Sequence, residues 1–174
     1  MSSELRVDKI IPTAGVPTGG GGGIIQVVSA STSVDFSTNS TSYVDITGCT
    51  VNITPKFSTS KILVTFSVQF GVGSTGTPVG MRLERGGTGI GIADAASNRN
   101  RGTVAEQTTY SNANNTVRLA TSQFLDSPNT TSSVTYNVAI HSSNTWYINR
   151  SEENIDGNNH TVGTSFITAM EVSA

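Results

Sequence analysis

Residues 61–70 carry the strongest structural signal in the sequence. Every second residue is large and apolar: Ile62, Val64, Phe66, Val68 and Phe70. The residues between them are mainly polar: Leu63, Thr65, Ser67 and Gln69. Because successive side chains of a strand point to opposite faces, this period predicts a strand with one buried face and one mostly wet face. Antiparallel sheets have this pattern, whereas parallel sheets are apolar on both faces.

Similar alternation recurs along the rest of the chain. It is clear in residues 79–85, 117–121, 134–140 and 164–172, and shorter strand patterns occupy residues 24–29, 43–46, 49–53 and 145–149. Turn-forming clusters separate these segments at 74–78, 97–100, 127–129 and 156–159. Gly48 interrupts one strand pattern, which indicates a bulge or bend. Roughly eight or nine strands in a chain of this length predict an all-β, jelly-roll-like antiparallel β-sandwich spanning residues 24–174.

The composition supports this fold class and excludes others. Charged residues are only 13% of the chain, too few for a charge-rich disordered segment or for helices with solvated faces. The chain is instead rich in Ser, Thr, Asn and Gly, as expected for short strands joined by turns. A net charge of −2 gives no general basic surface, so we expect no nucleic-acid partner. The single Cys49 excludes an intrachain disulfide and a Cys-based zinc site.

Residues 1–23 differ from the remainder of the chain. Prolines and glycines punctuate this segment, and it ends in five consecutive glycines at 19–23, which lose much entropy on ordering. We therefore expect an extended N-terminal arm with a Gly-rich hinge. Four apolar residues precede the hinge and favour docking of the arm on another protein: Leu5, Val7, Ile10 and Ile11. The alternative is a tail without a role.

The sequence contains no segment that predicts membrane insertion or secretion. No apolar run approaches the roughly 18–20 residues of a membrane span. The first residues lack the apolar stretch of a signal peptide. We therefore expect a protein that is made and first folds in a reducing cytoplasm.

The motifs that could carry catalysis or cofactor binding have simpler explanations. Residues 71–76 match a dinucleotide-binding glycine pattern, but a strand pattern follows where a helix is required. His141 and His160 have no partner at metal-ligand spacing, and no Gly-x-Ser-x-Gly elbow is present. The acidic and amide residues of 152–159 lack calcium-loop spacing and read as a solvated loop. We expect no enzyme activity, no cofactor and no metal.

Two pairs of residues are candidates for contacts with another molecule. Trp146 and Tyr147 are adjacent on a strand, so one fills the core and the other lies at a surface, where a trimer interface or a glycan is the expected partner. Arg99 and Arg101 form a small basic patch in a predicted loop, which solvent or an ion pair explains more simply than phosphate.

Several blocks of the sequence resemble tail-fibre-like structural proteins of phages, especially those infecting cyanobacteria and other aquatic bacteria. The first block is Leu-Arg-Val-Asp-Lys-Ile-Ile-Pro at 5–12, followed by the glycines and Ile-Ile-Gln-Val-Val at 24–28. Further blocks lie at 41–45, 51–55, 58–64, 124–128 and 167–172, so the resemblance covers nearly the whole chain. It implies a compact homotrimer of the tumour-necrosis-factor/C1q-like jelly-roll kind, an arm that attaches to other virion proteins, and no catalytic residues.

The resemblance implies a place in the virion but leaves its position open. The chain has no room for a long shaft, which leaves a short tail fibre, a knob or a capsid decoration protein. In the fibre hypothesis, host surface glycan is the candidate ligand of the loops at 71–78, 94–103, 111–115 and 151–163. In the decoration hypothesis, the arm clamps neighbouring capsid subunits. A virion-bound glycan hydrolase is a third hypothesis, and it lacks the clustered acids that such enzymes need.

Overall fold

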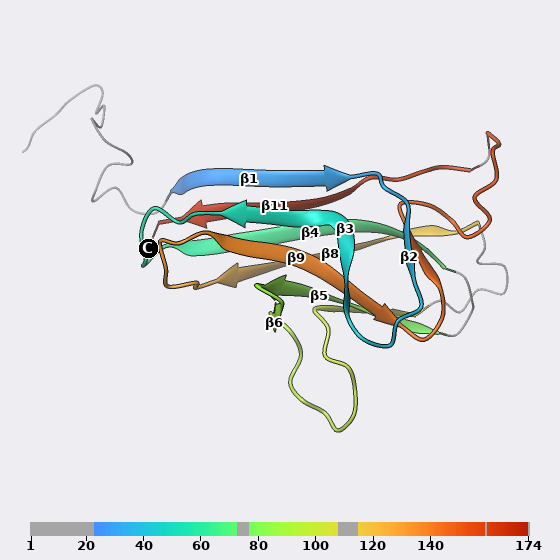
Figure 1. Ribbon diagram of the computed structural model, residues 1–174, viewed down its shortest axis with the longest axis horizontal. Coiled ribbons are helices and arrows are strands. Elements are labelled where there is room, and N and C mark those ends of the chain that lie inside the picture. Colours follow the sequence, from blue (N-terminus) through green and yellow to red (C-terminus); the bar gives the residue numbers. More distant parts are fainter. Residues whose placement is uncertain (1–22, 73–76, 108–114, 159, 174) are drawn as a thin grey trace, which may run out of the picture.

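A computed structural model describes residues 23–72, 77–107, 115–158 and 160–173 (Figure 1). These residues form eleven strands and no helix. The strands are β1 (Ile24–Thr32), β2 (Phe36–Thr38), β3 (Val44–Ile53), β4 (Lys61–Val72), β5 (Pro78–Arg85), β6 (Thr88–Ile90), β7 (Val104–Gln107), β8 (Val117–Asp126), β9 (Val134–Ser142), β10 (Trp146–Ile148) and β11 (Ser165–Val172). The expected arm, with Leu5, Val7, Ile10 and Ile11, lies outside the described residues.

The strands form two antiparallel sheets, as the sequence predicted. In sheet A, β4 pairs with β8 on one side and with β11 and β10 on the other, and β1 and β2 pair with β11 and β10. In sheet B, β3 pairs with β9, β9 with β5, and β5 with β6 and β7. The pairs β1·β11, β3·β9, β4·β8 and β5·β7 are nested in the chain, as in a long hairpin rolled up on itself. This nesting supplies the strand topology of a jelly roll, which the sequence pattern had left open.

The core lies between the two sheets and follows the predicted alternation. The inward side chains of β4, from Ile62 to Phe70, are each at most 2% exposed, while Leu63, Thr65, Ser67 and Gln69 are half-buried on the outer face. Facing residues of β9, such as Tyr136 and Ile140, complete the core. Cys49 is a free thiol in this core, and burial raises its pKa to about 11.

The predicted irregularity at Gly48 is confirmed. The register of β3 against β9 shifts between Asp45 and Thr50. Gly48 has a φ of 83°, a conformation that favours glycine, and a Cβ there would lie 2.6 Å from Oγ1 of Thr32. The bulge therefore needs glycine for both its backbone angle and its close approach to β1.

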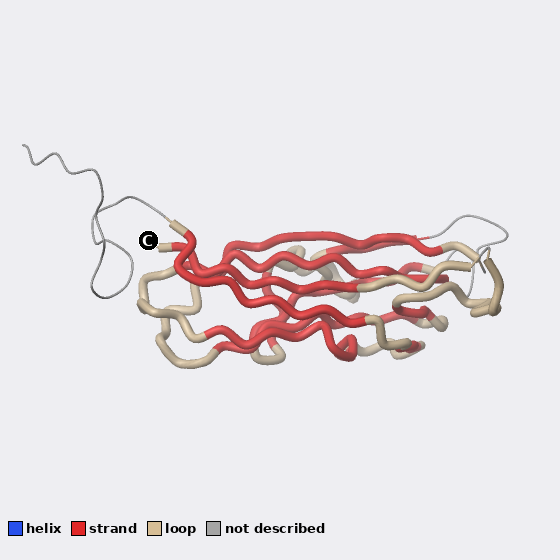
Figure 2. The backbone as a smooth tube through the Cα atoms, turned by 90° about the horizontal axis from the view of Figure 1, so that it is seen from above, coloured by secondary structure: helices blue, strands red, loops and turns tan. Residues whose placement is uncertain are grey.

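The molecule is elongated along its strands, with the start of β1 and the end of β11 at one end and the segment 149–164 at the other (Figures 1 and 2). At the terminal end, the backbone N–H of Ser173 donates to the carbonyl of Gly23 at 3.0 Å. We call the opposite end the distal end. There β10 pairs with the last residues of β4, and the segment 149–164 continues from β10. Of the four loops predicted to be distal, the described residues of 71–78 (71–72 and 77–78) and of 151–163 (151–158 and 160–163) adjoin this end, and 111–115 lies outside the described residues except Asn115. The segment 91–103 instead projects from the edge of sheet B between β6 and β7 (Figure 1).

Candidate functional site

Three regions of the described chain gather side chains that could recognise or hold another group: the outer face of sheet B, a pocket at the distal end, and the outer face of sheet A. Among the described residues, no three His, Cys, Asp or Glu side chains lie together in a way that could hold a metal ion. In that same part of the chain no helix is long and apolar enough to cross a membrane.

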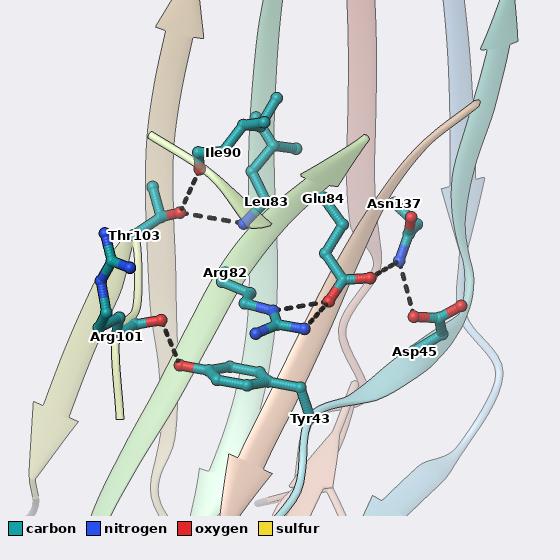
Figure 3. Close-up of polar contacts among 9 residues, drawn as sticks. All are labelled: Tyr43, Asp45, Arg82, Leu83, Glu84, Ile90, Arg101, Thr103 and Asn137. Atoms are coloured by element: carbon teal, nitrogen blue, oxygen red, sulfur yellow. Dashed lines mark hydrogen bonds and ion pairs between the residues drawn. The ribbon is translucent and has the colours of Figure 1, made fainter. Parts of the chain in front are cut away.

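The outer face of sheet B carries a cluster of charged and amide groups around Glu84 (Figure 3). The carboxylate of Glu84 is nearly buried and accepts from Nε of Arg82 at 2.6 Å and from Nδ2 of Asn137 at 3.0 Å. Asn137 also donates to Asp45 at 2.6 Å. The three strands β3, β5 and β9 place these groups side by side, because Asn137 is directly opposite Glu84 in the ladder. We call Asp45, Arg82, Glu84 and Asn137 the sheet B cluster.

Tyr43 and His141 extend the sheet B cluster toward the segment 91–103. The guanidinium of Arg82 stacks over the Tyr43 ring at 4.0 Å, and the Tyr43 hydroxyl donates to the carbonyl of Arg101 at 3.0 Å. The His141 ring packs edge-on against Tyr43 at 4.6 Å between centroids. Gly80, opposite His141, leaves room for this ring, because a Cβ at that position would clash with it.

Burial changes the proton affinities in this region. Burial, together with the nearby Glu84 carboxylate, raises the pKa of Asp45 above its usual range, against the opposing effects of Asn137 and Arg82. Burial and the adjacent Arg82 charge lower the pKa of His141. The cluster's groups hydrogen-bond or stack on one another. This arrangement fixes the segment 91–103 against sheet B through the Tyr43 hydroxyl and the carbonyl of Arg101.

The segment 149–164 at the distal end encloses a pocket with a volume of about 280 Å³. The lining includes Arg150, Ser151, Asn154, Asp156, His160 and Thr161. Gly71 explains why this segment can cross the end of β4, since a Cβ at Gly71 would clash with the carbonyl oxygen of Arg150. Packing against this segment thus explains the first glycine of the 71–76 pattern.

Buried Asn149 anchors both ends of this segment. Its Nδ2 donates to the carbonyls of Thr32 and Val34 at 3.0 and 2.9 Å, and its Oδ1 accepts from the Ser165 hydroxyl at 2.6 Å. Its own carbonyl accepts from the N–H of Gly163 at 2.6 Å. The pocket is therefore built on a segment fixed to β1 and β11.

The outer face of sheet A carries an apolar row near the terminal end. The ladder registers place Val27, Met170, Leu63 and Leu125 directly next to one another across β1, β11, β4 and β8. Val27 and Leu125 are 55% and 47% exposed. The next row toward the distal end, Ser29, Thr168, Thr65 and Gln123, is polar. We call the four apolar residues the sheet A row.

The structure separates the two aromatic residues that the sequence singled out. Trp146 is fully buried and packs against Phe70 in the core, at 5.3 Å between ring centroids. Tyr147 points to the other face, where the guanidinium of Arg150 stacks over its ring at 4.2 Å. Of this pair, only Tyr147 is exposed enough to contact another molecule.

Both arginines of the predicted basic patch lie in the segment 91–103. Arg101 donates to the carbonyl of Ala93 at 2.5 Å within the segment 91–103, and Arg99 is exposed in the same segment. This segment lies at the edge of sheet B, away from the segment 149–164 (Figure 1). Arg99 and Arg101 are therefore not part of the surface that the distal segment forms.

Sequence reasoning missed the sheet B cluster, and it named 151–163 as a candidate ligand-contact loop without predicting a pocket there. A signal for the cluster existed, because Arg82 and Glu84 occupy the polar positions of one alternating strand and Asn137 occupies a polar position of another. The pocket had a weaker signal in its polar residues, since 152–159 were interpreted as a solvated loop. Its anchoring pairs are too far apart in the sequence to be recognised from spacing.

Comparison with known proteins adds no family to this description. No family model matches the chain, and no curated protein matches it.

Proposed function

We propose that this chain is a structural protein of a bacteriophage particle, and that it acts as a short tail fibre or receptor-binding homotrimer attached by its N-terminal arm. The sequence blocks described above support a phage structural role. The nested jelly roll agrees with the fold that this resemblance implies. The observation that carries the proposal is the division of the molecule into a terminal end with an exposed apolar row and a distal end with an anchored, pocket-bearing segment.

The sheet A row supports self-association. Four apolar side chains in register form a strip in which Val27 and Leu125 are exposed and Leu63 and Met170 are half-buried. Contiguous exposed apolar surface on a soluble domain marks an interaction site. Closed symmetric association of identical chains covers such a strip at every copy. We therefore place the trimer contacts on the outer face of sheet A.

The positions of the chain ends support attachment at one end and recognition at the other. Gly23 and Ser173 hydrogen-bond to each other at the terminal end, so the point at which the expected arm joins the sandwich lies at this end. An arm that leaves at this end directs the distal pocket away from its attachment point. This polarity suits a fibre tip.

Gold-labelled antibodies on intact particles of the phage that encodes the chain test the proposed location. Label at the tail or its periphery would support the fibre role. Label spread over the head would establish the alternative, a capsid decoration protein. Absence of label from purified particles would refute both.

A truncation tests the role of the arm. Deleting residues 1–22 keeps Gly23 and its hydrogen bonds to Ser173. We expect a soluble trimer, measured by light scattering, that no longer enters particles. Incorporation of the truncated protein would show that the arm is not the attachment segment.

A further inference from the structure

We propose that the distal pocket formed by Arg150, Ser151, Asn154, Asp156, His160 and Thr161 binds one uncharged sugar ring of a glycan. This inference rests on the proposed receptor-binding role and names the ligand class for it. The particle labelling described above tests that role independently of any ligand.

The guanidinium of Arg150 is held firmly beside the pocket. Its Nε donates to Asp35 at 2.6 Å, and one terminal nitrogen donates to the carbonyls of Ser151 and Glu152 at 2.8 and 3.2 Å. The Tyr147 ring supports its flat face. A donor fixed in this way loses little freedom when it binds a ligand, which is the advantage of a preorganised site.

The polar groups of the pocket suit hydroxyl ligands, which both donate and accept hydrogen bonds. Arg150 can only donate, ionised Asp156 can only accept, and the Ser151 and Thr161 hydroxyls can do either. Nδ1 of His160 is buried and has no hydrogen-bond partner within the described residues.

The apolar lining and the charge narrow the ligand class further. Ile155 and Val162, which also line the pocket, are 54% and 75% exposed, and they offer aliphatic surface to the C–H groups of a sugar ring. Glu152, Glu153 and Asp156 accompany Arg150 on this segment, and Arg150 is already paired with Asp35. The excess of carboxylates disfavours phosphate, sulfate and uronic acids.

The size of the pocket agrees with a single ring. Its volume of about 280 Å³ lies just below the roughly 300–1,000 Å³ of sites that enclose drug-sized ligands. A longer glycan would therefore place one ring in the pocket and leave its neighbours on the surface.

Backbone amide NMR titration of the full chain provides the test. The probes are the methyl glycosides of glucose, galactose, mannose and N-acetylglucosamine at millimolar concentration, with glucuronate and glucose 6-phosphate as charged probes. We expect at least one neutral glycoside to shift signals of the segment 150–162, and the charged probes to bind more weakly.

A matched pair of glycine substitutions localises the binding. Gly157→Leu fills the pocket, and its Cβ would lie 3.9 Å from His160 and 4.0 Å from Ile155, which is ordinary contact. Gly23→Leu adds the same side chain at the terminal end, where a Cβ meets nothing within 4 Å. We expect Gly157→Leu to raise the Kd at least about tenfold and Gly23→Leu to leave it within about twofold.

Three results would overturn the inference: no shifts with any neutral glycoside, tighter binding of a charged probe, or binding that Gly157→Leu leaves intact. If the particles are labelled at the tail and any of these occurs, only the pocket assignment fails. If the label lies on the head while a glycoside binds, the receptor-binding role fails and the pocket assignment stands.

Discussion

The outer faces of the two sheets differ in how far the chain's own side chains cover them. On sheet B, the chain covers its own face, since Tyr43 and Arg82 lie over it and the sheet B cluster joins three strands. As a result Ala139, which shares this face with Arg82, is 0% exposed. On sheet A, the corresponding outward positions of β1, β4, β8 and β11 carry exposed or half-buried side chains.

This difference indicates which face remains available to a partner. A face whose polar groups are already hydrogen-bonded to one another gains little from association, because a partner would have to replace those bonds. Association through an uncovered apolar row removes its side chains from water, which stabilises the complex by roughly 25 cal/mol per Å² of apolar surface buried. Association is therefore expected through sheet A, while sheet B stabilises the single subunit.

The largest expected effect is the loss of assembly on charging the sheet A row. Leu63 lies in the middle of the row, between Met170 and Leu125. Leu63→Glu should convert the proposed trimer to a folded monomer, because three carboxylates would be brought into an apolar interface. Sedimentation velocity measures the mass, and circular dichroism checks the fold.

Asn52→Glu is the matched control for this substitution. Asn52 is an exposed residue of β3 in sheet B, and a glutamate there keeps an acceptor for the Thr135 hydroxyl. This variant should remain trimeric. A monomeric wild-type protein, or a Leu63→Glu variant that stays trimeric, would show that the sheet A row is not the interface.

The next largest effect concerns the sheet B cluster. Glu84→Ala removes the acceptor shared by Arg82 and Asn137 and should lower the free energy of unfolding by about 3 kcal/mol. Glu106→Ala breaks a more exposed pair with Arg118, 3.4 Å long, and should cost less than about 1 kcal/mol. Urea unfolding of both variants in the Leu63→Glu background separates subunit stability from assembly. Equal losses would mean that the cluster does not stabilise sheet B.

The sequence predicted most of the fold because the decisive signals were local. The alternation of β4 identified its buried residues one by one, and Gly48 identified the bulge in β3. β2 and β7 were not predicted. Each is only three or four residues long, too short for a period, and forms by pairing with β10 or β5.

The candidate sites were less predictable because they depend on long-range pairs. Asn149 anchors the distal segment through Thr32, and Arg150 pairs with Asp35, so both contacts join residues more than a hundred positions apart. Glu84 is buried because strands β3 and β9 bring Asp45 and Asn137 beside it. No residue pattern within a single segment predicts these long-range contacts. The assignment of Trp146 to the core, in contrast, needed the structure only to choose between two adjacent aromatic residues.

A smaller effect is expected from the protonation of His141. Its pKa is lowered in the folded chain, chiefly by burial and then by Arg82, so the unfolded chain takes up the proton first as the pH falls below about 6.5. Tyr43, Asn100 and Arg82 face the ring, and none supplies a negative charge. Wild-type stability should therefore fall between about pH 7.5 and about pH 5 more than that of His141→Gln. Parallel declines in urea unfolding would contradict this expectation.

The smallest expected effect has the opposite sign and comes from Asp45, on the same face. Burial and Glu84 raise its pKa, so the folded chain holds this proton more tightly than the unfolded chain, and ionised Asp45 opposes folding at neutral pH. Asp45→Asn keeps an acceptor for Asn137 and should be slightly more stable than the wild type at neutral pH. This advantage should shrink as the pH falls toward 3.8, where the wild-type carboxyl gains its proton. Urea unfolding of the two proteins across this range measures the difference, and a variant that is less stable at neutral pH would show that the Asp45 charge supports sheet B.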